Sequence, residues 1–129
     1  KLKSLALMYG KLTALDLGAL SELETLNCNS NALTALDLTK NPKLKYLYVQ
    51  ANKLTALDVS RNPELEHLYV SIMSFMSNQI ETLDITQCPK ITQLYAVDMT
   101  SLKQLRMLRA HKEANILMSV PATTEIIYE

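Results

Sequence analysis

The chain has 129 residues, 48% of them hydrophobic, and this composition predicts one folded domain rather than a disordered segment. Thirteen basic and thirteen acidic residues give a formal charge of zero, so the sequence predicts no nucleic-acid partner. No run of eighteen apolar residues is present, and we therefore expect no membrane insertion. The neutral balance favours a protein or glycan partner.

The start of the chain and its cysteines leave the compartment open. Lys1, Leu2 and Lys3 already lie inside a repeat, with no leader before them, which predicts a mature fragment or a trimmed chain. Cys28 and Cys88 occupy different repeat positions, about two to three turns apart. Stacked strands are about 4.8 Å apart, so two turns exceed the roughly 7 Å that a disulfide tolerates. We expect both cysteines to be free and buried.

An apolar pattern recurs every 21 residues along most of the chain. It is clearest at residues 44–64, where LKYLYVQAN and LTALDVSRN both read L-x-x-L-x-V-x-x-N. Such a short repeat predicts a solenoid, because one 21-residue unit cannot bury its own hydrophobic face. The register shifts at residues 72–76, which we interpret as a five-residue insertion, and the pattern ends near residue 107.

Each unit is expected to begin with a short strand, since every second residue of L-x-x-L-x-L lies on one side. Leu47 should then point inward and Tyr46 outward, and neighbouring units should pair as parallel strands. The second half of the unit should return in an extended form, because no 3.6-residue apolar period is present. Pro42, Pro63 and Pro89 mark the corner between one unit and the next.

The C-terminal segment departs from the pattern. Residues 101–114 are rich in helix formers, while residues 124–128 alternate like a strand. We interpret residues 1–107 as the solenoid and residues 108–129 as a capping segment of the same domain. This segment is expected to form a closing half-turn over the last open edge.

The signature L-x-x-L-x-L-x-x-N, nearly intact in LETLNCNSN and LKYLYVQAN, resembles the leucine-rich repeat family. The unit LKYLYVQANKLTALDVSRNP is similar to short repeats of surface and secreted proteins of Bacteroidetes. The resemblance implies a leucine-rich repeat solenoid, α/β by convention but mostly β here, with a parallel concave sheet, about five turns, extended return segments and an irregular C-terminal cap. It implies an asparagine ladder of Asn31, Asn52 and Asn78 that bonds backbone groups, and an extracellular or cell-surface location.

Two outward columns on the concave sheet carry the candidate binding residues. Tyrosine dominates recognition surfaces because it is amphipathic and loses little entropy on being fixed. The alternative is that these rings pack on one another and only stabilise the sheet. Phe75, in the apolar insertion, is a further candidate contact, against the alternative that the insertion folds over the core. The candidate residues of the two columns are Tyr46, Tyr48, His67, Tyr69, Gln93 and Tyr95.

A third outward column consists of Asp16, Asp37, Asp58 and Asp84. Stacked carboxylates could bind a cation, but calcium needs several oxygens that converge on one point. We expect these side chains instead to accept hydrogen bonds from corner amides or to lie in solvent, paired with lysines such as Lys53. The sequence therefore predicts no metal site.

Catalysis has little support. His67 and His111 are the only histidines, and neither has a metal-ligand or nucleophile-base spacing. Two glycines cannot supply a glycine-rich phosphate loop. We interpret the chain as a binding module, not an enzyme, without a cofactor. The alternative is a structural spacer or assembly segment of a longer surface protein, which forms a homodimer through the open N-terminal edge at residues 2–7.

Overall fold

The structure, a computed structural model, describes residues 1–71 and 77–129. The expected insertion at residues 72–76, including Phe75, lies outside the described residues. One side of the molecule is a six-stranded parallel sheet, ordered β1-β2-β3-β4-β6-β8. Its strands are β1 (Ser4–Ala6), β2 (Thr25–Asn27), β3 (Tyr46–Tyr48), β4 (His67–Ser71), β6 (Gln93–Ala96) and β8 (Leu117–Ser119).

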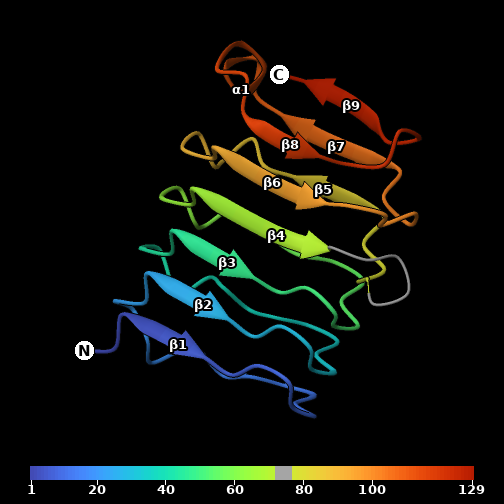
Figure 1. Cartoon of the computed structure of the whole chain (residues 1–129). Coiled ribbons are helices and arrows are strands. Elements are labelled where there is room, and N and C mark those ends of the chain that lie inside the picture. Colours follow the sequence, from blue (N-terminus) through green and yellow to red (C-terminus); the bar gives the residue numbers. More distant parts are fainter. Residues whose placement is uncertain (72–76) are drawn as a thin grey trace.

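A second parallel sheet forms on the return side, from the fourth turn onward. It consists of β5 (Thr82–Asp84), β7 (Gln104–Met107) and β9 (Glu125–Tyr128), in that order. The chain climbs one coil at a time from the N-terminus at one end of the stack to the C-terminus at the other (Figure 1). No helix of the described residues is long and apolar enough to cross a membrane.

The predicted solenoid with a parallel sheet is confirmed, with six turns rather than about five. Adjacent strands pair with the 21-residue offset of the repeat, as in Leu5 with Leu26 and Leu26 with Leu47. Leu26, Leu47 and Leu68 are fully buried between half-buried neighbours, as the alternation predicts. Each buried leucine side chain contributes about 2 kcal/mol. The shared leucine interior therefore holds the coils together.

Residues 108–129 form the sixth turn and not a closing half-turn. Strand β8 pairs with β6, and β9 pairs with β7, so this segment extends both sheets. The expected strand near residues 124–128 is confirmed as β9. Of the helix-rich residues 101–114, only α1 (Arg109–Glu113) is helical, because residues Gln104–Met107 pair with β5 instead. Tertiary pairing here overrides intrinsic helix propensity.

Candidate binding face and the polar columns between coils

The tyrosine face comprises the six candidate residues on the outer side of the six-stranded sheet. The strand register places Tyr46, His67 and Gln93 in one column. It places Tyr48, Tyr69 and Tyr95 in the column beside it. All six side chains are half-buried, and the leucines between them are buried on the opposite side of the sheet. The expected outward columns are therefore present in the structure.

The rings of the tyrosine face contact one another from coil to coil. Tyr69 lies between Tyr48, at a centroid distance of 5.1 Å, and Tyr95, at 4.6 Å with the rings stacked. Tyr46 meets His67 edge to face at 4.9 Å. Contacts of this kind contribute about 0.5–1.5 kcal/mol each beyond the buried area. They stabilise the sheet and also fix the rings before any partner arrives.

Two hydroxyls of the face are held by hydrogen bonds. The Tyr69 hydroxyl donates to Gln93 Oε1 at 2.7 Å, and the Tyr46 hydroxyl donates to Glu66 Oε2 at 3.2 Å. Burial raises the pKa of Tyr69, and the negative charge of Glu66 raises the pKa of Tyr46. Both phenols therefore stay neutral at physiological pH. The result is a preorganised aromatic surface on which these two phenols are uncharged.

The asparagine column, Asn31, Asn52 and Asn78, lies just beyond the strand ends. Asn52 Nδ2 donates to the carbonyls of Cys28 at 2.9 Å and Val49 at 3.1 Å, and its Oδ1 accepts the Leu33 N–H at 3.0 Å. One amide thus joins two coils and satisfies buried backbone groups. The equivalent partners are Leu7, Cys28 and Leu12 for Asn31, and Val49, Val70 and Leu54 for Asn78.

The backbone just before this column adopts a left-handed conformation that L-residues rarely take. Ser30 and Ala51, which precede Asn31 and Asn52, have φ angles of 57° and 53°. Such a residue costs about 1 kcal/mol or more. The asparagine hydrogen bonds offset that cost. At the first coil Gly10 occupies the asparagine position, and a Cβ there would lie 2.7 Å from Asn31 Oδ1.

A second column at the opposite corner was missed by sequence reasoning, which used only the prolines there. Asn41 Nδ2 donates to the carbonyls of Leu17 and Leu20 at 3.1 and 3.0 Å. Asn62 Nδ2 donates to the carbonyls of Leu38 and Asn41 at 3.1 and 3.0 Å. The signal that could have revealed it is the recurrence of asparagine before Pro42 and Pro63.

Cysteine and histidine continue this second column in the later coils. Cys88 Sγ donates to the Val59 carbonyl at 3.3 Å. His111, almost fully buried, accepts the Leu108 N–H at Nδ1, so Nε2 carries the proton and donates to the Cys88 carbonyl at 3.0 Å. Cys88 and His111 thus bond backbone groups as Asn41 and Asn62 do.

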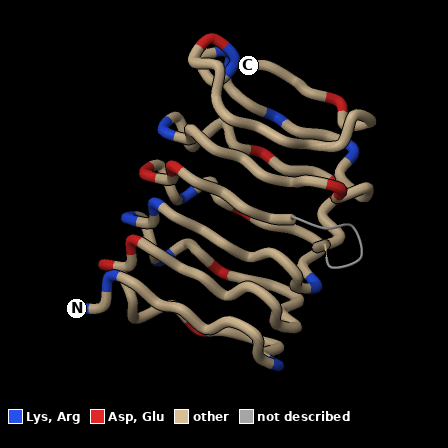
Figure 2. Tube along the Cα trace, in the orientation of Figure 1, with Lys and Arg blue, Asp and Glu red and all other residues tan. Residues whose placement is uncertain are grey.

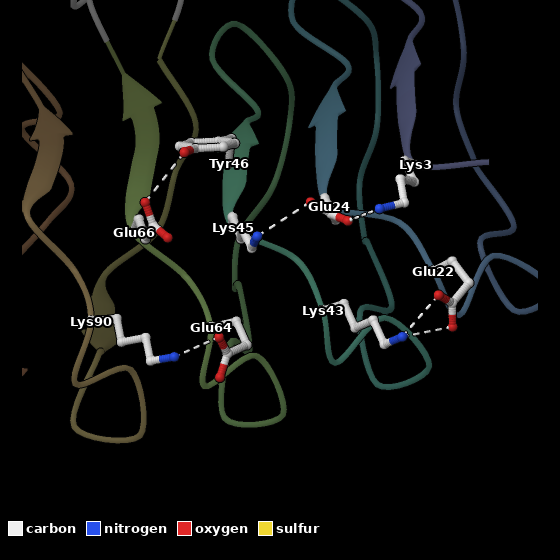
Figure 3. Close-up of polar contacts among 9 residues, drawn as sticks. All are labelled: Lys3, Glu22, Glu24, Lys43, Lys45, Tyr46, Glu64, Glu66 and Lys90. Atoms are coloured by element: carbon white, nitrogen blue, oxygen red, sulfur yellow. Dashed lines mark hydrogen bonds and ion pairs between the residues drawn. The ribbon is translucent and has the colours of Figure 1, made fainter. Parts of the chain in front are cut away.

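The ion-pair corner runs along the edge where the strands of the six-stranded sheet begin, and sequence reasoning missed it too. Lysine and glutamate alternate from coil to coil, so basic and acidic positions follow one another up this edge (Figure 2). Figure 3 shows how the side chains reach across the coils. The pairs are Lys3 with Glu24 at 2.7 Å, Lys45 with Glu24 at 3.3 Å, Lys43 with Glu22 at 2.8 Å and Lys90 with Glu64 at 2.6 Å.

Residues 21–62 match the family model described as "Leucine Rich repeats (2 copies)". A solved structure described as "Functional domain of InlJ from Listeria monocytogenes includes a cysteine ladder" is 22% identical, with a TM-score of 0.37. That match covers 98% of this chain and 43% of the other, so the chain spans less than half of that structure's length. No curated protein matches the sequence.

The aspartates on the return side of the solenoid form local turns. In each case Oδ1 accepts the backbone N–H two residues later, at 2.8–2.9 Å. Hydrogen bonds from Thr39 and Ser60 lower the pKa of Asp37 and Asp58. Arg106 pairs with Asp84, whereas no ion pair joins Lys53 to the column in the described residues. No group of three or more potential metal ligands was found in the described part of the chain.

The potentially reactive side chains of the described residues make structural contacts. Cys28 and Cys88 are free and buried, as predicted. Burial raises the pKa of Cys28 to about 11 and that of Cys88 to about 12, so both remain thiols. His67 packs against Tyr46, and His111 bonds backbone groups. The cysteines and histidines of this chain therefore serve packing and backbone bonding.

Proposed function

We propose that this chain is a non-catalytic binding module that presents the tyrosine face to a protein or glycan partner. The supporting observation is the set of outward rings, fixed by mutual contacts of 4.6–5.1 Å across neighbouring coils. Binding to such rings costs little side-chain entropy, because their rotamers are already restricted. A cell-surface or secreted location in a bacterium belongs to the same proposal, supported by the resemblance of the two-part repeat.

The test compares a double variant, Tyr48→Ala with Tyr69→Ala, with the unmodified chain. Both proteins are immobilised, and the affinity of each retained partner is measured by surface plasmon resonance. Two central tyrosines should together contribute a hundredfold or so in affinity. The matched control is Thr25→Ala with Asn27→Ala, which alters the same two columns one coil before the first rings of the face. If the two double variants bind the partner with equal affinity and keep intact circular dichroism spectra, the tyrosine face is not the binding surface.

A second candidate function, assembly through the N-terminal edge, is favoured by a separate observation. Strand β1 ends the six-stranded sheet, and no described strand pairs with its outer edge. The first coil also carries large apolar residues that are at least 36% exposed. They are Leu2, Leu7, Met8, Tyr9 and Leu12. Contiguous exposed apolar residues of this kind often mark an interface.

Light scattering coupled to size-exclusion chromatography tests this second candidate. Assembly predicts a dimer whose fraction rises with concentration and is abolished by Leu7→Glu, which places a charge in the contact. The control is Leu117→Glu, at an exposed leucine of the last turn. A monomer at every concentration would contradict assembly through the edge.

A further inference from the structure

A hollow of about 460 Å³ lies between the coil of β6 and the last coil. We name it the Leu117 hollow. Its lining includes the apolar side chains of Pro89, Ile91, Ile116 and Leu117, together with Glu66 and Lys90. It thus combines apolar surface with charged groups, which is the composition of a site for an amphipathic group.

The Leu117 hollow adjoins the tyrosine face. Leu117 pairs with Gln93 in the strand register, so it continues the column that contains Tyr46 and His67. Leu117 is 55% exposed, and every other exposed large apolar residue of the described chain belongs to the first coil. An exposed leucine beside a hollow and an aromatic face extends the candidate contact surface.

Glu66 gives the hollow a charge that the chain does not neutralise. The acidic residues Glu22, Glu24 and Glu64 of the ion-pair corner each pair with a lysine. Glu66 forms no ion pair in the described residues and accepts a hydrogen bond from the Tyr46 hydroxyl (Figure 3). Its column reads Lys3, Glu24, Lys45 and Glu66, and the next coil has Thr92 where the alternation would place a basic residue. Lys90 already pairs with Glu64, so it does not neutralise Glu66.

We propose that the Leu117 hollow receives an apolar side chain of a protein partner while a neighbouring lysine or arginine of that partner pairs with Glu66. The cation completes the alternation of the ion-pair corner, and the apolar group covers Leu117. A neutral glycan carries neither group. This inference rests on the proposed function and names its partner as a protein segment in which a basic residue stands next to an apolar one.

The test uses the whole chain, labelled with nitrogen-15, and three capped tetrapeptides observed by heteronuclear NMR. The probe is acetyl-Gly-Lys-Leu-Gly-amide, and the controls replace its lysine with glutamate or its leucine with glycine. We expect the probe to shift the amide signals of Thr92, Ile116 and Leu117. Both controls should bind more weakly, because each lacks one of the two recognised groups.

Three variants of the protein separate the charge from the apolar contact. Glu66→Gln should weaken probe binding about threefold, the usual scale of an exposed ion pair, and this effect should fade at high salt. Leu117→Ser should weaken it about fivefold through lost apolar area. The matched control is Glu22→Gln, which removes an acidic residue of the same corner two coils away and should leave the affinity unchanged.

The proposal is overturned if the probe shifts no amide signal near the hollow, or if Glu66→Gln and Glu22→Gln change the probe affinity equally. Shifts confined to the amides of Tyr48 and Tyr69 would reject the hollow and leave the proposed function standing. The double tyrosine variant tests the face independently, so failure of the hollow and failure of the face are distinguishable.

Discussion

Neighbouring coils are joined by polar side chains in two regions, the asparagine column and the ion-pair corner. In both regions a side chain reaches its partner in the adjacent coil, at the spacing of the repeat. Asn52 is 6% exposed and bonds backbone groups, whereas the Lys43 side chain is 54% exposed and bonds the side chain of Glu22. A buried polar group that loses its hydrogen-bond partner destabilises the fold, because no water replaces the partner. An exposed group that loses its partner is solvated by water, so its loss costs little. The asparagine column should therefore hold the coils in place, and the ion-pair corner should add little stability.

The largest expected effect is that of Asn52→Ala. It leaves the buried Leu33 N–H without its acceptor, and the Cys28 and Val49 carbonyls keep only Asn31 and Asn78 as asparagine donors. The free energy of unfolding should therefore fall by about 2 kcal/mol. Urea denaturation at pH 7 measures this loss. The matched control is Asn31→Ala, at the same repeat position but only half-buried, with an expected loss of about 1 kcal/mol. A larger loss for Asn31 than for Asn52 would contradict the dependence on burial.

A smaller effect is expected from Glu22→Gln combined with Glu64→Gln. This double variant breaks two ion pairs of the exposed corner, and its urea midpoint should equal that of the unmodified chain at physiological salt. A slight decrease should emerge only at low ionic strength, where screening is weak. If the double variant loses as much stability as Asn31→Ala, the contrast between the two regions is wrong.

The smallest effect concerns pH. Hydrogen bonds from Lys43 and Lys3 lower the pKa of Glu22 and Glu24, respectively, below the ordinary value of 4.5. A carboxyl group whose pKa is lower in the folded state stabilises the fold when the pH is above its unfolded-state pKa. That stabilisation is lost as the pH falls through the folded-state pKa. Urea midpoints measured from pH 7 to pH 3 should fall less in a Glu22→Gln, Glu24→Gln variant. An identical slope in both proteins would show that these carboxylates do not contribute.

The local pattern of the sequence was sufficient for much of the fold and of the candidate face. Alternation within Tyr46, Leu47 and Tyr48 fixes which side chains face outward, since the strand period is two. The constant 21-residue offset then places Tyr69 beside Tyr48. The same offset also relates the alternating charges and the asparagines before proline.

Tertiary structure alone decided the last turn, the contact geometry and the hollow. Residues 108–129 lack the repeat, and their strands form because β6 and β7 offer unpaired edges to them. The exposure of Leu117, the missing cation partner of Glu66 and the stacking of Tyr69 on Tyr95 likewise depend on how successive coils lie against each other. A repeating sequence determines each coil and its register, because those follow from local periodicity. Contacts where the repeat is interrupted depend on non-local packing, which no local pattern encodes.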